Sequence, residues 1–164
     1  MSEILWCADN GDGTYRNPVL YCDYSDPDAI CVNGTYYLTA STFNYVPGLP
    51  ILTSRDLVNW KLRNYAVKNI PEARYAAPQH AQGIWAPAIR FQNGRFYIYY
   101  GMPDEGIYMV STENPLGDWD TPVLVKPGKG MIDPCPFWDD DGRAYIIHGY
   151  AKSRIGFKIG RAHV

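Results

Sequence analysis

The chain has 164 residues, enough for one domain with a core of its own; 46% of them are hydrophobic and 20% are charged, as in ordinary globular proteins. The formal charge of −2 leaves no basic surface to neutralise phosphates, which argues against nucleic acid as a partner. No apolar run approaches the roughly 20 residues that span a bilayer, so no membrane partner is expected either. Aromatic residues make up 15% and suit both β-strands and stacking on sugar rings.

The cysteines and the first residues bear on the compartment. Four cysteines lie at irregular spacings with no Cys-x-x-Cys pair: Cys7, Cys22, Cys31 and Cys135. We interpret them as buried free thiols rather than zinc ligands or disulfides. If Met1 is the true start, the chain opens without the basic and apolar stretches of a secretory signal. The sequence therefore predicts a cytoplasmic protein.

A repeated hairpin pattern dominates the rest of the chain. Alternating β-branched and aromatic runs are separated by Gly, Asn, Asp and Pro, which is typical of an all-β protein. The segment 26–38 aligns with 86–98 so that Pro27 matches Pro87 and both Asn-Gly pairs coincide. A third copy starts at Asp133 and turns at Asp141-Gly142. Asn-Gly and Asp-Gly supply the positive φ angles of type I′ turns, so each copy predicts a hairpin.

The first two copies continue into a second hairpin, which gives units of four short strands with a period of ~50 residues. That pattern is typical of β-propeller blades, and closed propellers need roughly four to eight of them. We place blades near 26–67, 85–125 and 133–158, or about two and a half, within one partial propeller domain, 1–158. The chain is thus interpreted as part of a longer protein. Residues 159–164 depart from the repeat, and we interpret them as a non-native tail that matches one reading frame of a common sequencing adapter.

Asp26 and Asp133 hold equivalent places in the first and third repeats, each just before a proline. The first strand of each propeller blade lines the central channel, so the two carboxylates are expected to face each other there. Asp-Pro is also a common turn starter, which leaves a purely structural role open. Ala86 at the matching place in the second repeat argues that the turn itself does not need aspartate.

Several motifs in order resemble the opening of glycoside hydrolase family 43, from about Asn17 to Phe157, and most closely its β-xylosidases and α-L-arabinofuranosidases. They are Asn17-Pro18-Val19, Ser25-Asp26-Pro27-Asp28, Ser41-Thr42-Phe43, Ser54-Arg55-Asp56-Leu57-Val58-Asn59-Trp60, Trp85-Ala86-Pro87, Ile132-Asp133-Pro134 and Asp139-Asp140-Asp141-Gly142. The resemblance implies a five-bladed propeller and hydrolysis with inversion. It implies that Asp26 is the general base, that Asp133 tunes the pKa of the acid and orients it, and that Phe43 and Trp85 wall the sugar subsite. No cofactor or metal is implied for the chemistry, and the partner is a small plant-derived oligosaccharide that loses arabinofuranosyl or xylosyl residues.

The family's catalytic glutamate has no match in this chain. Glu3, Glu72, Glu105 and Glu113 all lie outside the matching context, so the chain is expected to be inactive alone. A sugar-binding propeller without catalysis stays open as the alternative, whereas a WD-repeat scaffold is disfavoured because Trp119-Asp120 occurs once. Neither His80 nor His148 has the spacing of a metal ligand.

Overall fold

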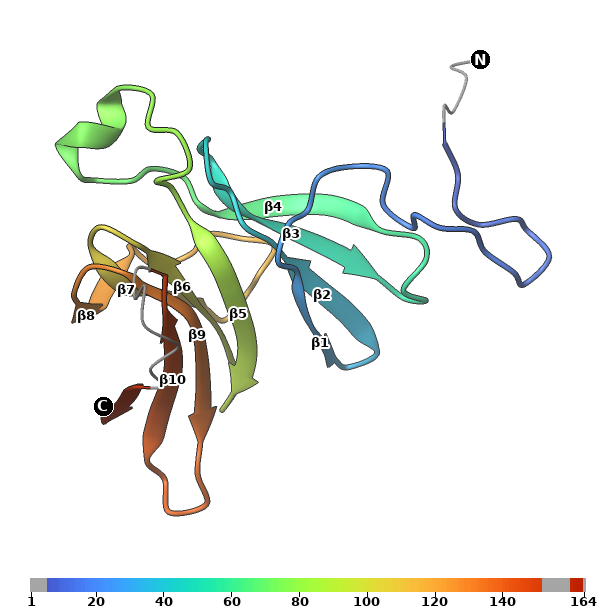
Figure 1. Cartoon of the computed structure of the whole chain (residues 1–164). Helices are drawn as coiled ribbons and strands as arrows, with labels where there is room; N and C mark the ends of the chain where they lie inside the picture. The colour runs from blue at the N-terminus through green and yellow to red at the C-terminus, as the bar shows by residue number, and fades with distance from the viewer. Residues whose placement is uncertain (1–5, 152–159, 164) are drawn as a thin grey trace.

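The computed structural model describes residues 6–151 and 160–163, and within them it holds three antiparallel sheets (Figure 1). The first two sheets have four strands each, in the orders β1-β2-β3-β4 and β5-β6-β7-β8, and the third has the order β11-β10-β9. The strands are β1 (Asp28–Val32), β2 (Thr35–Thr39), β3 (Gly48–Ser54), β4 (Lys61–Val67), β5 (Trp85–Gln92), β6 (Arg95–Met102), β7 (Gly106–Thr112), β8 (Val123–Pro127), β9 (Met131–Trp138), β10 (Ala144–Tyr150) and β11 (Gly160–His163). One 3₁₀ turn, Ala73–Ala76, interrupts the long connection between β4 and β5. The all-β prediction is confirmed.

Two of the three predicted turns have the expected backbone. Asn33 and Gly34 have φ angles of 50° and 72°, and Asn93 and Gly94 have 49° and 79°, as type I′ turns require at both central positions. The third turn was predicted wrongly. Only Gly142 has a positive φ there, of 79°, and its N–H donates to the carbonyl of Asp139, so a type I turn with a left-handed glycine closes a three-residue loop.

The first strands of the sheets, β1, β5 and β9, lie side by side and hold the sheets together. A carboxylate oxygen of Asp28 on β1 accepts the backbone N–H of Ile89 at 2.8 Å and Nη1 of Arg90 at 2.6 Å, both on β5. Nη2 of Arg90 lies 3.2 Å from the sulfur of Cys135 on β9. One arginine thus links the leading strands of all three sheets, which is the arrangement expected of consecutive propeller blades.

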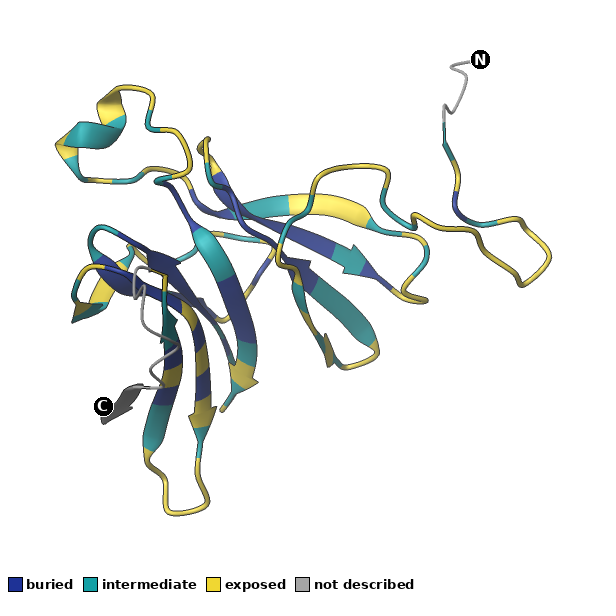
Figure 2. Cartoon of the chain, in the orientation of Figure 1, coloured by how far each residue is buried: buried dark blue, intermediate teal, exposed yellow. Residues whose placement is uncertain are grey.

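Two buried layers separate the sheets, and strand β6 supplies both (Figure 2). Ile98 and Tyr100 pack with Leu49 and Ile51 of the first sheet, whereas Tyr99 joins the layer that contains Ile146 of the third sheet. Successive side chains of a strand point to opposite faces, so one strand buried on both faces reads as an unbroken apolar run. The second sheet is therefore the centre of the molecule.

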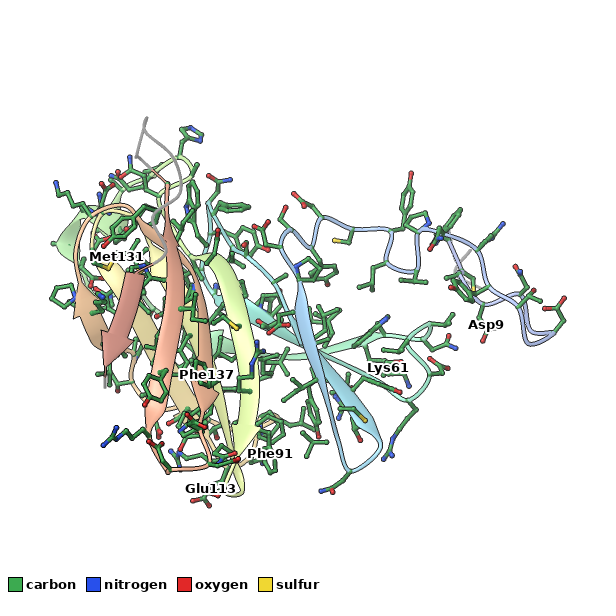
Figure 3. The ribbon with its side chains drawn as sticks, turned by 60° about the horizontal axis from the view of Figure 1, so that its bottom comes forward. Asp9, Lys61, Phe91, Glu113, Met131 and Phe137 are labelled. Carbon is green, nitrogen blue, oxygen red and sulfur yellow. The ribbon has the colours of Figure 1, made fainter. Side chains whose placement is uncertain are left out.

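The described N-terminal residues 6–25 form an arm outside these layers, and the cysteines also lie outside them. An N-terminal arm that carries Asp9 runs away from the sheets, attached to the first of them by a 2.8 Å hydrogen bond between Asp9 and Asn59 (Figure 3). All four cysteines are free, as predicted, but they are exposed rather than buried. Cys7 and Cys22 lie on the arm, and Cys31 and Cys135 lie on the leading strands β1 and β9. No helix in the described part of the chain is long and apolar enough to cross a membrane.

The predicted tail falls partly outside the described residues. Gly160–His163 forms β11, which pairs antiparallel with β10, and nothing in this pairing bears on the origin of residues 159–164. That interpretation stays a prediction, which the coding DNA would test.

Candidate active site

The four residues predicted for the site line one open cavity of about 470 Å³. Asp26, Phe43, Trp85 and Asp133 share it with Ala81, Ala86 and Ile132. Asp26 precedes β1, Trp85 and Ala86 open β5, and Asp133 lies near the start of β9. The same end of three neighbouring leading strands therefore brings together side chains that are more than 100 residues apart in sequence.

Asp26 and Asp133 share an unusual backbone conformation. Their φ angles are 48° and 53°, in the left-handed region, although each precedes a proline, which normally favours an extended residue. Such conformations cost free energy and concentrate at functional sites. The Asp26 carboxylate is further fixed by Ser41, whose buried hydroxyl donates to Oδ2 at 2.8 Å. The backbone N–H of Ser41 in turn donates to the carbonyl of Ser25 at 2.9 Å.

The two carboxylates interact electrostatically. Partial burial raises the pKa of Asp133, and the negative charge of Asp26 raises it further. The structure thus distinguishes two carboxylates that the sequence places in equivalent positions, since Asp26 accepts a hydroxyl hydrogen bond while the pKa of the Asp133 carboxyl is raised.

Two aromatic rings form a corner of the cavity. Phe43 and Trp85 meet edge to face, with centroids 5.5 Å apart and an interplanar angle of 90°. The indole N–H of Trp85 donates to the carbonyl of Ala81 at 2.9 Å, and the backbone N–H of Gly83 donates to the carbonyl of Phe43, also at 2.9 Å. The first bond holds the Trp85 ring, and the second holds the Phe43 main chain. Apolar ring faces beside carboxylates suit a sugar, which has apolar C–H faces and polar edges.

No glutamate among residues 6–151 lines this cavity. Glu72 accepts the hydroxyl of Tyr108, Glu105 pairs with Arg74 at 2.6 Å, and Glu113 lies 3.4 Å from Arg95. The prediction for Glu3 falls outside the described residues. Within the described ranges no cluster of three or more His, Cys, Asp or Glu side chains could hold a metal ion, and 139–142 is a hairpin turn.

The sequence matches the family model described as glycosyl hydrolases family 43 over residues 15–162. The chain belongs to glycoside hydrolase family 43. The match covers the cavity and all three sheets, so the predicted resemblance is confirmed for the family.

Family 43 relatives agree in sequence and in fold. A protein named as a candidate β-xylosidase from Xylanibacter ruminicola is 46% identical over 140 residues, covering 85% of this chain and 26% of the relative. A non-reducing end α-L-arabinofuranosidase of Bacteroides ovatus, BoGH43B, is 36% identical over 151 residues, covering 87% and 28%. The crystal structure of the family 43 protein BlXynB of Bacillus licheniformis superposes with a TM-score of 0.73 at 28% identity, covering 92% of this chain and 33% of that one. The chain thus spans about a quarter of the length of the curated relatives it matches, and the propeller fold is shown.

Sequence reasoning missed the partners that hold the site. The motif Ser41-Thr42-Phe43 contains Ser41, but its bond to Asp26 depends on β2 ending beside β1. Ala81 and Gly83 lie in a connection with no periodic pattern, so no signal in the sequence marks them. The catalytic roles of Asp26 and Asp133 stay predictions.

Proposed function

We propose that this chain is the N-terminal part of an inverting glycoside hydrolase that releases terminal arabinofuranosyl or xylosyl residues from plant-derived oligosaccharides. The observation that carries the proposal is the meeting of Asp26, which precedes β1, and Asp133 of β9 with two aromatic rings in one cavity. Relatives named as β-xylosidase and α-L-arabinofuranosidase support the substrate class without deciding between the two sugars.

In the proposed reaction Asp26 is the general base. It takes a proton from a water molecule, the water oxygen bonds to the anomeric carbon, and the glycosidic bond to the leaving oxygen breaks on the opposite face. Ser41 keeps the Asp26 carboxylate oriented toward the water. Asp133 orients the acid that protonates the leaving oxygen, and its charge keeps that acid protonated. Phe43 and Trp85 hold the sugar whose bond is cut.

The general acid is the missing part. Among the described residues, no glutamate lines the cavity. This supports a general acid that lies outside this chain, in the part of the protein that corresponds to the remaining length of its relatives. We accordingly propose that the 164-residue chain binds sugar but does not hydrolyse it.

The test uses the longer protein, made by continuing this chain into its own downstream coding sequence. Hydrolysis of nitrophenyl arabinofuranoside and nitrophenyl xyloside is measured for wild type and for Asp26→Asn. Removing a general base lowers kcat about 10²- to 10⁴-fold. Asp140→Asn, in the exposed hairpin turn between β9 and β10, is the matched control and should retain full turnover. Unchanged turnover of Asp26→Asn would remove Asp26 from the mechanism.

A sugar-binding propeller without catalysis is the second candidate, favoured by the absence of a glutamate from the described cavity. Calorimetry separates the two. A longer protein that binds xylose or arabinose through Phe43 and Trp85, yet hydrolyses no glycoside, supports the binding protein. Hydrolysis that depends on Asp26 contradicts it.

We also propose that the protein works in a reducing compartment such as the cytoplasm. The four free cysteines support this proposal. Titration of thiols in protein purified without reductant should find all four; disulfide formation would contradict it.

A further inference from the structure

The same bulge recurs in all three sheets, where the leading strand passes the active-site cavity. At this place the leading strand holds one residue more than the second strand of its sheet, and the ladder shifts in register. The residue before each bulge still meets a residue of the second strand: Ser25 bonds to Ser41 through the backbone, Trp85 pairs with Gly101, and Ile132 pairs with Gly149. The residues that follow are Asp26, Ala86 and Asp133. Bulges are frequent beside active sites, where they re-aim a side chain, and Ser41, Gly101 and Gly149 therefore hold equivalent positions beside them.

Ser41 and Gly149 lie beside the two carboxylates in the same way but offer them different groups. The hydroxyl of Ser41 donates to Oδ2 of Asp26 at 2.8 Å. In the third sheet, a Cβ added at Gly149 would stand 3.7 Å from Oδ2 of Asp133. A hydroxyl on that Cβ can come within hydrogen-bonding distance of the same oxygen. The two sites thus share their arrangement and differ by one side chain.

Packing does not require a glycine at position 149. The atoms nearest to its added Cβ would be Cγ1 of Ile132 at 3.5 Å, and Oδ2 of Asp133 and the carbonyl oxygen of Ile132 at 3.7 Å, which are ordinary van der Waals contacts. The φ angle of Gly149 also lies outside the left-handed region that favours glycine. Gly101 is different, because a Cβ there would lie 3.1 Å from the carbonyl oxygen of Met131 and 3.2 Å from Cα of Ile132. The missing side chain at Gly149 therefore needs a reason other than space.

The consequence of this difference is seen at the Asp133 carboxylate. Among residues 6–151 and 160–163, no hydrogen-bond donor reaches it. Partial burial and the charge of Asp26 therefore act on it unopposed, and both raise its pKa. Asp26, by contrast, has the Ser41 hydroxyl to hold one of its oxygens in place. Both oxygens of Asp133 stay available to a donor from outside the described residues.

We propose that Gly149 is a positioning residue for the reaction. Because it carries no side chain, it leaves the Asp133 carboxylate free to hold the general acid, whereas Ser41 at the equivalent position fixes Asp26 as the base. The inference rests on the proposed function, because it needs a general acid for Asp133 to orient. Two aspartates at equivalent places in one repeat thus acquire different tasks from the second strand of each sheet, rather than from the leading strands near which they lie.

The test compares Gly149→Ser with Gly149→Ala in the longer protein. Both variants add the same Cβ and only serine adds a hydroxyl, so the alanine variant is the matched control. Carbon NMR of the Asp133 carboxyl group should show a lower pKa in Gly149→Ser, because the new donor favours the charged form. On nitrophenyl glycosides, kcat of Gly149→Ser should be about 10-fold below that of Gly149→Ala with little change in KM, the size of one hydrogen bond to a charged group. The alkaline limb of its pH–rate profile should move to lower pH, because a hydrogen-bonded Asp133 raises the pKa of the general acid less.

Ser41→Ala gives the reciprocal experiment and should lower kcat about 10-fold, since Asp26 loses its donor. Equal pKa values of Asp133 and equal pH–rate profiles in the two Gly149 variants would overturn the inference, as would an unchanged kcat of Ser41→Ala. A Gly149→Ala protein that fails to fold would also overturn it, because packing would then require the glycine. Failure of the proposed function looks different: Asp26→Asn would keep full turnover, while a lower pKa of Asp133 in Gly149→Ser than in Gly149→Ala would still support the contact between position 149 and Asp133.

Discussion

Replacing Gly83 by alanine should destabilise the protein and disturb the aromatic corner. A Cβ at Gly83 would stand 2.7 Å from the carbonyl oxygens of both Phe43 and Thr42, and 3.0 Å from the carbonyl carbon of Phe43. These contacts are backbone atoms, so no side-chain rotation relieves them. They also belong to a small bridge, in which Gly83 donates to Phe43 at 2.9 Å and Ile84 donates to Thr42 at 3.2 Å.

The size of the effect follows from the two losses. Forcing a methyl group into packed backbone costs typically about 1–3 kcal/mol. Losing the bond from Gly83 to Phe43 adds about 0.5–1.5 kcal/mol, so we expect a loss of about 2–4 kcal/mol in the free energy of unfolding. In a domain of 150–250 residues that loss would lower the melting temperature by roughly 5–15 °C, and in the longer protein the shift should be smaller.

The assay is chemical and thermal unfolding of the longer protein, followed by tryptophan fluorescence, to which Trp85 beside the bridge contributes. Gly117→Ala is the matched control, since its Cβ would first meet the Asn114 side chain, at 3.1 Å, which can move aside. We expect it to cost less than about 1 kcal/mol, as surface changes usually do. If Gly83→Ala is as stable as Gly117→Ala, the close approach of Gly83 to the turn after β2 is wrong, and with it the support that this contact gives to Phe43.

Three further results are expected. Asp26→Asn should lower the pKa of Asp133, because it removes the like charge, and carbon NMR of the Asp133 carboxyl group measures that pKa. An unmoved pKa would mean that the two carboxylates are not coupled. Because folding raises the pKa of Asp133, the stability that this group contributes is present at acid pH and is lost as the pH rises through the folded pKa. Arg74→Met should lower the free energy of unfolding by about 1–3 kcal/mol. This loss is smaller than that from breaking a fully buried ion pair, because the Arg74 side chain is one-third exposed. A double-mutant cycle with Glu105→Gln that shows no coupling would refute the pairing. The 164-residue chain should self-associate in sedimentation experiments through the face of the third sheet on which Ile147 is 46% exposed, and Ile147→Lys should reduce this association. A monomeric wild-type chain with a sharp, cooperative thermal transition would contradict this prediction.

Local chemistry made most of the fold predictable from the sequence. Asn33-Gly34 and Asn93-Gly94 adopt the positive φ angles that short hairpins need, and this requirement is met within two residues. Asp141-Gly142 misled the prediction because the same glycine serves a three-residue loop equally well, and the choice depends on how β9 and β10 pair. The cysteines were also wrongly predicted to be buried, since their exposure depends on how the arm and the leading strands lie in the folded protein.

The sequence by itself determined the repeat, the family and the equivalent positions of Asp26 and Asp133, because a repeated hairpin leaves its mark at fixed intervals along the chain. It could not determine that Ser41 bonds to Asp26, that Arg74 pairs with Glu105, or that Gly83 lies against Phe43. Those contacts involve connections with no periodicity, and each joins residues that meet only after the strands have paired and the connections have folded over them. Tertiary structure therefore decided the walls of the site, since a loop takes its shape from the distant surface against which it lies.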